Sequence, residues 1–172
     1  MTNPTPIDVQ KIFAAAVGTI DDAGGADATY LDNGPAAKRI LCDCDGTLFD
    51  VRGTGAQQLN EELFAFLYMA KQNGFNVTIH TNTLAGNTDR VKLFSKVHFG
   101  DPMAFEVVDK TETNGVHAAI IFDDDHSTHG AKSPNKWEPR DPRMLALLET
   151  MRQANPAFKV NKPFKVFTGL NP

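Results

Sequence analysis

The sequence predicts an α/β protein with a three-layer α/β/α, Rossmann-like fold around a central, mainly parallel sheet. Short apolar runs alternate with stretches of helical periodicity, which is the pattern of βαβ units. Three of the four runs in the middle of the chain end in polar residues suited to a ligand site, and open parallel sheets bind ligands at the carboxyl ends of their strands. The 172 residues, 41% of them hydrophobic, suffice for one substantial core.

The expected elements begin with a helix over residues 7–20 and a Gly- and Asp-rich loop over residues 21–37. Residues 39–42 form the first core strand. Residues 56–73 form an amphipathic helix that Gly74 ends. The apolar face of this helix holds Leu59, Leu63, Phe66, Leu67 and Ala70.

Two more strands and a helix are expected in the next part of the chain. Residues 75–80 form the second strand, and residues 105–108 form the third, which ends near Lys110. Between them we expect a short helix that Asn87 or Thr88 caps and that runs through residue 96.

The last part of the chain predicts a fourth strand over residues 116–122. A helix from Pro142 to about residue 155 follows, because Asp141 offers a capping side chain before a proline at the first helical position. The tail, residues 158–167, is expected to form a last strand or edge segment. We therefore divide the chain into an N-terminal helix and linker, residues 1–36, and one core domain, residues 37–172.

Composition limits the partners. The net charge of −4 does not indicate a nucleic-acid or anionic-membrane binder, although a local basic patch would still allow nucleic acid. No apolar run approaches the roughly 20 residues that span a bilayer, and residues 1–12 lack the apolar core of a signal peptide. Cys42 and Cys44 lie two apart in the expected strand and point to opposite faces, so they cannot form a disulfide. We expect a cytoplasmic protein without a membrane partner.

Two aspartates, Asp43 and Asp45, follow the first strand and precede Gly46. Neighbouring carboxylates repel each other and are costly to desolvate, so a divalent metal with a phosphoryl group is the natural partner. A calcium loop with Gly46 at its sixth position would need Leu41 and Arg52 as ligands, which excludes that type of site. A turn-capping role accounts for one carboxylate well and for two poorly.

The apolar strand followed by Asp-x-Asp-Gly-Thr resembles the first motif of the haloacid dehalogenase (HAD) superfamily. Thr81 resembles the second motif, Lys110 the third, and Asp123-Asp124 after an apolar strand the fourth. The motifs occur in the family's order over residues 38–150. The resemblance implies a HAD-like hydrolase core domain over residues 37–172. Because Asp45 stands where the phosphatases of the family carry aspartate, it favours a phosphohydrolase over a dehalogenase.

The resemblance also implies a role for each residue. Asp43 would attack phosphorus and form an aspartyl-phosphate, and Asp45 would act as general acid and base. Thr81 would donate its hydroxyl to the phosphoryl group, and Lys110 would neutralise negative charge. Mg²⁺ would be held by Asp43, by the backbone carbonyl of Asp45, and by Asp123 and Asp124. Gly46 would keep the turn open, with nearby backbone N–H groups facing phosphate oxygens.

Alternatives exist for two of these positions, and one further aspartate needs an interpretation. Thr83 is the alternative to Thr81, because the end of the second strand is uncertain by a few residues. Lys92 and Lys96 are the alternatives to Lys110, although both fall in an expected helix, where lysines are normally solvated. Asp125 is interpreted as a solvated loop carboxylate rather than a ligand.

Four more residues near the motifs have competing interpretations. His126 and His129 have the spacing of transition-metal ligands, but without a third ligand nearby an exposed or substrate-facing loop is favoured. Trp137 either stacks on a base or sugar, with nearby basic residues holding a phosphate, or anchors its loop on the core, which is favoured. Cys44 is interpreted as a small buried hydrophobe rather than a redox switch.

The segments between Thr47 and Thr81 and between Thr83 and Lys110 have room for one helix each, not for a large cap domain. We therefore expect an open site, unless residues 1–36 or a neighbouring subunit of a homo-oligomer covers it. The phosphorylated substrate is accordingly either a small molecule or an exposed phosphate on a macromolecule.

The sequence leaves two functions in competition. The first is a Mg²⁺-dependent phosphatase acting on a phosphate monoester. The second is a catalytically degenerate HAD-like binding or regulatory module, which the unusual Cys-Asp-Cys and triple-aspartate segments suggest. A two-component receiver domain uses similar residues, but its acidic pair comes first and its lysine last, so the order of the motifs excludes it.

Overall fold

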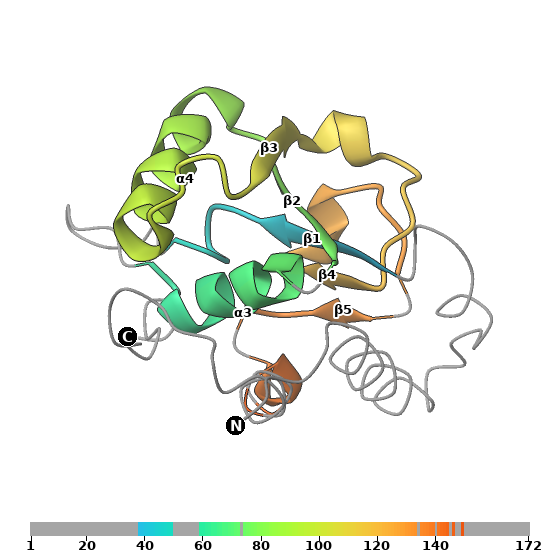
Figure 1. The fold of residues 1–172 in the computed structure, drawn as a ribbon. Helices are drawn as coiled ribbons and strands as arrows, with labels where there is room; N and C mark the ends of the chain where they lie inside the picture. Colours follow the sequence, from blue (N-terminus) through green and yellow to red (C-terminus); the bar gives the residue numbers. More distant parts are fainter. Residues whose placement is uncertain are drawn as a thin grey trace.

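The computed structural model describes residues 38–49, 59–72, 74–133, 135–139 and 141–144, together with residues 146 and 149. Within them, five strands form one parallel sheet with the order β3-β2-β1-β4-β5 (Figure 1). The strands are β1 Arg39–Asp43, β2 Asn76–Thr81, β3 Glu106–Asp109, β4 Ile120–Phe122 and β5 Lys136–Trp137. The parallel sheet and its helices confirm the predicted α/β class. The elements expected over residues 1–37 and 158–167 lie outside the described residues.

Strand β1 is the centre of the sheet and is buried on both faces. Ile40 and Cys42 point into the main hydrophobic cluster, whereas Leu41 points into a smaller one on the opposite face. In the sheet, Ile40 lies between Val77 of β2 and Ile120 of β4. A strand that is apolar on both faces is typical of parallel sheets, and it explains why this run could be recognised in the sequence.

The two long helices that the structure describes are α3 (Glu61–Gln72) and α4 (Leu84–Phe99), and both pack in the main cluster. The rings of Phe64 in α3 and Phe99 in α4 lie 4.8 Å apart. These helices therefore cover one face of the sheet, the face of Ile40 and Cys42. The cluster on the opposite face contains Ala118 and Ala131 from the segments before and after β4. The expected helical layer on that second face is not among the described residues.

Helix α3 begins later than we predicted. Its N-cap is Asn60, whose side-chain oxygen accepts a hydrogen bond from the backbone N–H of Leu63 at 3.2 Å. Leu59, predicted to be helical, instead forms a bridge with Phe49. Gly74 adopts a φ of 93°, and its N–H donates to the carbonyl of Lys71, so the predicted stop is confirmed.

Helix α4 begins at Leu84, so the prediction that Asn87 or Thr88 caps it is wrong. Thr88 instead donates its hydroxyl to the Leu84 carbonyl within the helix, and the Asn87 amide is used by the candidate site described below. The helix ends at Gly100, which has a φ of 71° and donates its N–H to the Lys96 carbonyl.

The region around β4 also differs from the prediction. Only Ile120–Phe122 of the expected strand over residues 116–122 belongs to β4, because the N–H of Ala118 donates to the Lys132 carbonyl outside the sheet. Strand β5 forms where we expected a loop, since Trp137 is fully buried and its ring packs edge-on against Phe122. Trp137 therefore anchors the core, and the hypothesis that it stacks on a base or sugar is wrong.

The remaining described residues agree with the expected helix at Pro142, because residues 142–144, 146 and 149 are helical. The β1–β2 connection contains α3 and the β2–β3 connection contains α4, with no further domain among the described residues. No helix in the described part of the chain is long and apolar enough to cross a membrane.

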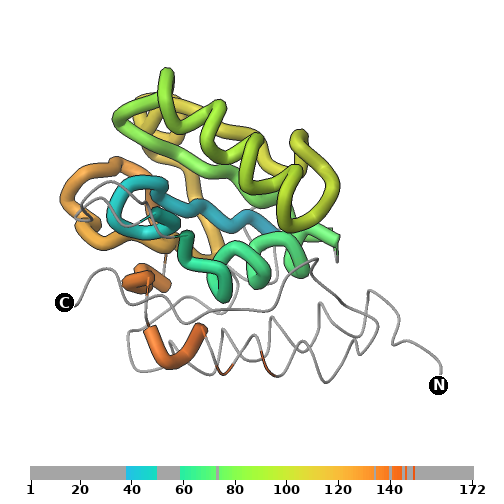
Figure 2. Tube along the Cα trace, turned by 90° about the vertical axis from the view of Figure 1, so that its left-hand side faces the viewer, coloured from blue at the N-terminus to red at the C-terminus, as the bar shows by residue number. Residues whose placement is uncertain are grey.

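Parallel pairing brings the carboxyl ends of the strands to one edge of the sheet. The strand order reverses at β1, where one neighbour, β2, follows it in the chain and the other, β4, comes later. Ligand sites of open α/β sheets lie at such a switch point. Figure 2 shows that the turn after β1 and the segment after β4 lie side by side at this edge.

Candidate active site

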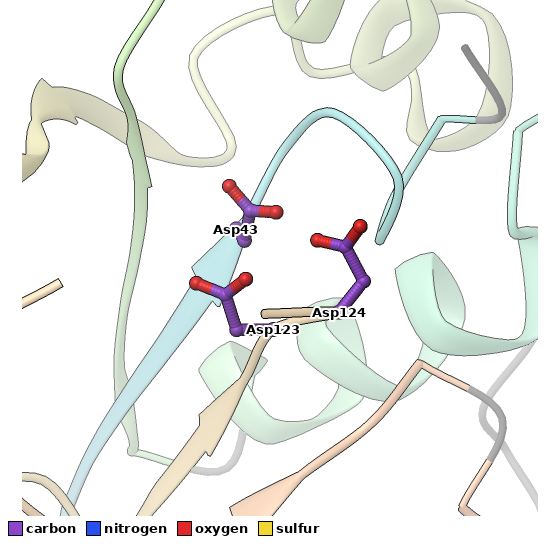
Figure 3. A group of neighbouring side chains, drawn as sticks. All are labelled: Asp43, Asp123 and Asp124. Atoms are coloured by element: carbon purple, nitrogen blue, oxygen red, sulfur yellow. The ribbon is translucent and has the colours of Figure 1, made fainter. Parts of the chain in front are cut away.

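Three aspartates meet at the switch point. Asp43 is the last residue of β1, and Asp123 and Asp124 directly follow β4. Each offers a carboxylate oxygen within 4.8 Å of the others, and Figure 3 shows the three side chains around a common space. Asp43 and Asp123 are buried, whereas Asp124 is exposed to solvent. The three predicted side-chain metal ligands are thus brought together; the carboxylate of Asp45 is not part of this group.

The turn after β1 is built around the closeness of Gly46 to Asp124. Gly46 has a φ of 81°, and a Cβ at this position would lie 2.3 Å from Oδ2 of Asp124. Thr47 then joins the two strand ends: its Oγ1 lies 3.0 Å from Oδ2 of Asp43 and accepts a hydrogen bond from the N–H of Asp124, also at 3.0 Å. Gly46 and Thr47 therefore hold Asp43, at the end of β1, close to Asp124, which follows β4.

The backbone amides of this turn do not serve as we expected. The N–H groups of Thr47, Leu48 and Phe49 donate to the Cys44 carbonyl, and that of Gly46 donates to the Phe49 carbonyl. These four amides are used inside the turn, because they fold the chain back after β1. The prediction that they face phosphate oxygens is wrong for these residues.

Lys110 supplies the positive charge of the site. Its Nζ lies 3.0 Å from Oδ1 of Asp43 and 2.9 Å from Oδ2 of Asp123, and it donates to Oγ1 of Thr128 at 2.7 Å. Burial alone lowers the pKa of Lys110, but the two carboxylates outweigh burial and raise it, so the side chain stays charged.

The alternative cations have a different environment. Lys92 and Lys96 lie on exposed positions of α4, as expected for solvated lysines of a helix. Lys110 is buried and follows directly after β3. It is therefore the lysine that the fold brings to the aspartates.

One lysine does not fully compensate the buried carboxylates. Burial, followed by the nearby charge of Asp123, raises the pKa of Asp43 well above its usual range, and Lys110 offsets only part of this effect. The ionised form of Asp43 is therefore unfavourable unless a further positive charge is present. Three carboxylates around one space offer the oxygen donors that a hard divalent cation prefers, so the residues fit Mg²⁺.

Asp45 is held apart from the aspartate group by two residues of α4. Arg90 donates to Oδ1 of Asp45 at 2.7 Å, and Nδ2 of Asn87 donates to Oδ2 at 2.9 Å. Arg90 also donates to Oδ1 of Asn87, which fixes the orientation of the amide, and its guanidinium lies 4.5 Å from the centre of the Phe49 ring. The Asp45 carboxylate is thus oriented by hydrogen bonds to both of its oxygens, and it does not belong to the group of candidate metal ligands.

The same amide orients the hydroxyl of Thr81. Oγ1 of Thr81 accepts hydrogen bonds from Nδ2 of Asn87 at 2.8 Å and from the N–H of Thr83 at 3.1 Å. A hydroxyl has two acceptor sites and one proton, so both acceptor sites are filled and the proton remains for donation. Thr81 is buried at the end of β2, whereas Thr83 is exposed and is the N-cap residue of α4. Thr81 is therefore the better oriented donor of the two.

The residues that the sequence analysis missed are Asn87, Arg90 and Thr128. Asn87 and Arg90 lie three residues apart and share one face of α4, and this spacing is the only signal that the sequence offers. Asn87 is 1% exposed, which is unusual for an asparagine and marks it as a residue with buried partners. Thr128 carries no recognisable pattern, because it reaches Lys110 through the loop after β4.

The remaining candidates lie outside the group of three aspartates. His126 and His129 bond to each other through Nδ1 and Nε2 at 3.1 Å, and no group of three potential metal ligands includes either of them among the described residues. Asp125 is exposed and accepts hydrogen bonds from the N–H and hydroxyl of Ser127, as expected for a loop carboxylate. Cys44 is buried, and burial followed by the charge of Asp45 raises its thiol pKa, which makes it unreactive.

A pocket of about 280 Å³ opens over this arrangement. Its walls include Asp43, Asp45, Thr81, Lys110 and Asp124. Comparisons of this chain with protein-family models, with curated proteins and with solved structures found no match. The evidence for function is therefore the chemistry of the site itself.

Proposed function

We propose that this protein is a Mg²⁺-dependent phosphohydrolase that cleaves a phosphate monoester, with Asp43 as the nucleophile. One observation carries the proposal: residues from the ends of β1, β2, β3 and β4 converge on one pocket, where Lys110 bonds to both Asp43 and Asp123. A nucleophile, a general acid/base, a hydroxyl donor and a fixed cation are the groups that phosphoryl transfer through a covalent intermediate requires.

The metal would be held by the side chains of Asp43, Asp123 and Asp124 and by the backbone carbonyl of Asp45. When bound, Mg²⁺ neutralises charge on the phosphoryl oxygens and on the carboxylates. The raised pKa of Asp43 supports this assignment, because a second cation beside Lys110 favours the ionised carboxylate that is the attacking form.

The chemistry divides into two displacements on phosphorus. In the first, a carboxylate oxygen of Asp43 attacks phosphorus, the bond from phosphorus to the ester oxygen breaks, and Asp45 gives that oxygen a proton. In the second, Asp45 takes a proton from water, the water oxygen attacks the aspartyl-phosphate, and Asp43 is released with inorganic phosphate. Throughout, the Thr81 hydroxyl donates to a phosphoryl oxygen and the Lys110 ammonium stabilises negative charge.

The topology supports a HAD-like, Rossmann-like assignment of the fold. The order β3-β2-β1-β4-β5 is that of the first five strands of the doubly wound sheet, with the proposed site at its switch point. A similar site on an unrelated parallel sheet would also satisfy the chemistry, so the proposed reaction depends on the residues rather than on the fold.

Purified protein with Mg²⁺ and p-nitrophenyl phosphate tests the proposal. We expect release of phosphate that EDTA abolishes, that Mg²⁺ restores, and that Asp43→Asn removes. Beryllium fluoride, which mimics a phosphoryl group on aspartate, should be trapped in the wild type and not in Asp43→Asn. The matched control is Asp89→Asn, because this aspartate is exposed on α4, lies outside the group of three and is not a wall residue of the pocket.

Two outcomes would contradict the proposal. If no ester is hydrolysed and beryllium fluoride is not trapped, the chain is the degenerate binding module that the sequence left open. If hydrolysis occurs but is the same in Asp43→Asn, the nucleophile is wrong.

A further inference from the structure

A second pocket adjoins the proposed catalytic pocket and has a different chemical character. It measures about 270 Å³ and shares three wall residues with the first: Asn82, Lys110 and Thr128. Any group esterified to a phosphate in the first pocket extends into neighbouring space, and this pocket is contiguous with it. The residues that line it therefore indicate which kind of leaving group would fit there.

The lining consists of small polar groups. Carboxamides, hydroxyls and one imidazole make up most of it, and among the described residues it has no aliphatic side chain or benzene-type ring. Besides Lys110 and Gly130, the wall residues are Asn82, Asn114, Thr111, Ser127, Thr128 and His129.

Charge recognition is also excluded at this pocket. Within the part of the chain that the structure describes, no carboxylate lines it, so an ammonium group has no partner there. Its single lysine, Lys110, is already bonded to Asp43 and Asp123, so its charge is compensated before a second anion arrives. The carboxamides of Asn82 and Asn114 can donate and accept hydrogen bonds. The hydroxyls of Thr111, Ser127 and Thr128 donate to residues outside the pocket lining and can still accept. This set suits uncharged hydroxyl groups.

Among the described residues of this pocket, the single aromatic ring available for stacking on a base is the imidazole of His129, which already bonds to His126. Proteins that bind bases without pairing them use exposed aromatic rings. Trp137, the single tryptophan of the chain, is fully buried against Phe122. A nucleoside would thus gain little from this pocket, and an alkyl chain would desolvate the polar walls without replacing their hydrogen bonds.

We propose that the pocket next to Lys110 binds the leaving group of the substrate, and that this group is small, uncharged and rich in hydroxyls, as in a polyol or monosaccharide phosphate. The inference rests on the proposed phosphohydrolase function and adds the substrate class to it. The volume supports one such unit, because sites for drug-sized ligands start at roughly 300 Å³.

Single substitutions of Asn114 and Gly130, two wall residues of this pocket, test the proposal. A Cβ at Gly130 would lie 2.2 Å from Oδ1 of Asn114, so Gly130→Ala displaces the carboxamide without touching the aspartates. Asn114→Leu keeps the approximate size but removes the hydrogen-bonding groups. Gly86→Ala is the matched control, because a Cβ there meets nothing within 4 Å.

The test measures kcat/KM with Mg²⁺ for four primary alkyl phosphates of similar intrinsic reactivity: glycerol 1-phosphate, glucose 6-phosphate, adenosine 5′-monophosphate and octyl phosphate. p-Nitrophenyl phosphate is the activated reference. We expect glycerol 1-phosphate or glucose 6-phosphate to exceed the adenosine and octyl esters at least tenfold. Asn114→Leu and Gly130→Ala should lower this preferred kcat/KM about three- to tenfold, the effect of one lost hydrogen bond between neutral groups, and leave p-nitrophenyl phosphate within twofold.

Preference for the adenosine or octyl ester would overturn the inference, as would equal loss on all five esters in Asn114→Leu. If only p-nitrophenyl phosphate is hydrolysed, the substrate class is wrong while the proposed reaction stands. If no ester is hydrolysed, the proposed function fails and the substrate class falls with it.

Discussion

Replacing Asn87 tests whether α4 takes part in the proposed reaction. The Nδ2 group of Asn87 bonds to Oδ2 of Asp45 at 2.9 Å and to Oγ1 of Thr81 at 2.8 Å. Leucine has a similar size and a high helix propensity, so Asn87→Leu removes both hydrogen bonds and keeps the helix. The substitution touches none of the three clustered aspartates and not Lys110.

The expected loss follows from these two contacts. A hydrogen bond to a charged group contributes about 1.5–3 kcal/mol and one between neutral groups about 0.5–1.5 kcal/mol. Together they amount to about 2–4.5 kcal/mol, which corresponds to a loss of about 30- to 1,500-fold in kcat/KM when 1.4 kcal/mol equals a factor of ten. The bond to Asp45 accounts for the larger share, so most of the loss should fall on proton transfer to the leaving oxygen.

The assay compares p-nitrophenyl phosphate, whose leaving group needs little protonation, with a primary alkyl phosphate, whose leaving group needs it. We expect Asn87→Leu to reduce kcat/KM for the alkyl ester at least tenfold more than for the aryl ester. Thr88→Ala, on the same helix, is the control, since the Thr88 hydroxyl bonds only to the Leu84 carbonyl in the described contacts. A folded Asn87→Leu protein that keeps both activities within threefold of the wild type would refute the reasoning, and equal loss on both esters would refute the role of Asp45.

Three further predictions concern the buried groups around the site. Lys110→Met should lower kcat for p-nitrophenyl phosphate by about 10²–10³, as loss of a fixed charge-stabilising group does, whereas Lys92→Met on the surface should leave it unchanged. Gly46→Ala should weaken Mg²⁺ binding in calorimetry, because its Cβ would lie 2.3 Å from a clustered carboxylate, while Gly86→Ala should bind Mg²⁺ normally. Burial, followed by the charge of the nearby lysine, lowers the pKa of His80 from 6.5 to about 4, so folding favours the neutral ring. The preference for the neutral His80 ring therefore stabilises the folded protein fully above pH 6.5, and this stabilisation is lost as the pH falls toward 4. A difference of 2.5 in pKa, at 1.36 kcal/mol per pKa unit, corresponds to about 3 kcal/mol. In urea unfolding, His80→Gln should therefore lose less stability between pH 7 and 4 than the wild type, and parallel losses would contradict this account.

Four of the predicted site residues that the structure brings together stand next to strands. Asp43, Thr81, Lys110 and Asp123 each occupy the last position of a strand or the position directly after one. Parallel pairing brings such positions to one edge whatever the exact register, so errors of one or two residues in the strand boundaries did not matter. The apolar runs were sufficient to predict that these positions meet at one edge of the sheet.

The missed elements depend on packing that no local pattern encodes. Strand β5 consists of only Lys136–Trp137 and lies among polar residues, so nothing marked it as a strand. Its place follows from the Trp137 ring, which fills the core beside Phe122. A lone tryptophan in a polar segment has the same sequence signature whether it binds a ligand or packs inward, and the available space in the core decides between them.

The contribution of α4 was hidden for a related reason. Asn87 and Arg90 resemble the ordinary polar face of a surface helix, and their position over the site depends on how α4 packs against β2 and β3. A buried carboxamide without partners destabilises a protein by about 1–3 kcal/mol, and a leucine at position 87 would suit the helix better. The asparagine is compatible with the fold because Asp45, Thr81 and Arg90 satisfy its polar atoms. Asn87 is therefore explained by its hydrogen bonds in the pocket and not by helix propensity. For this reason the helical pattern of the sequence did not indicate its position.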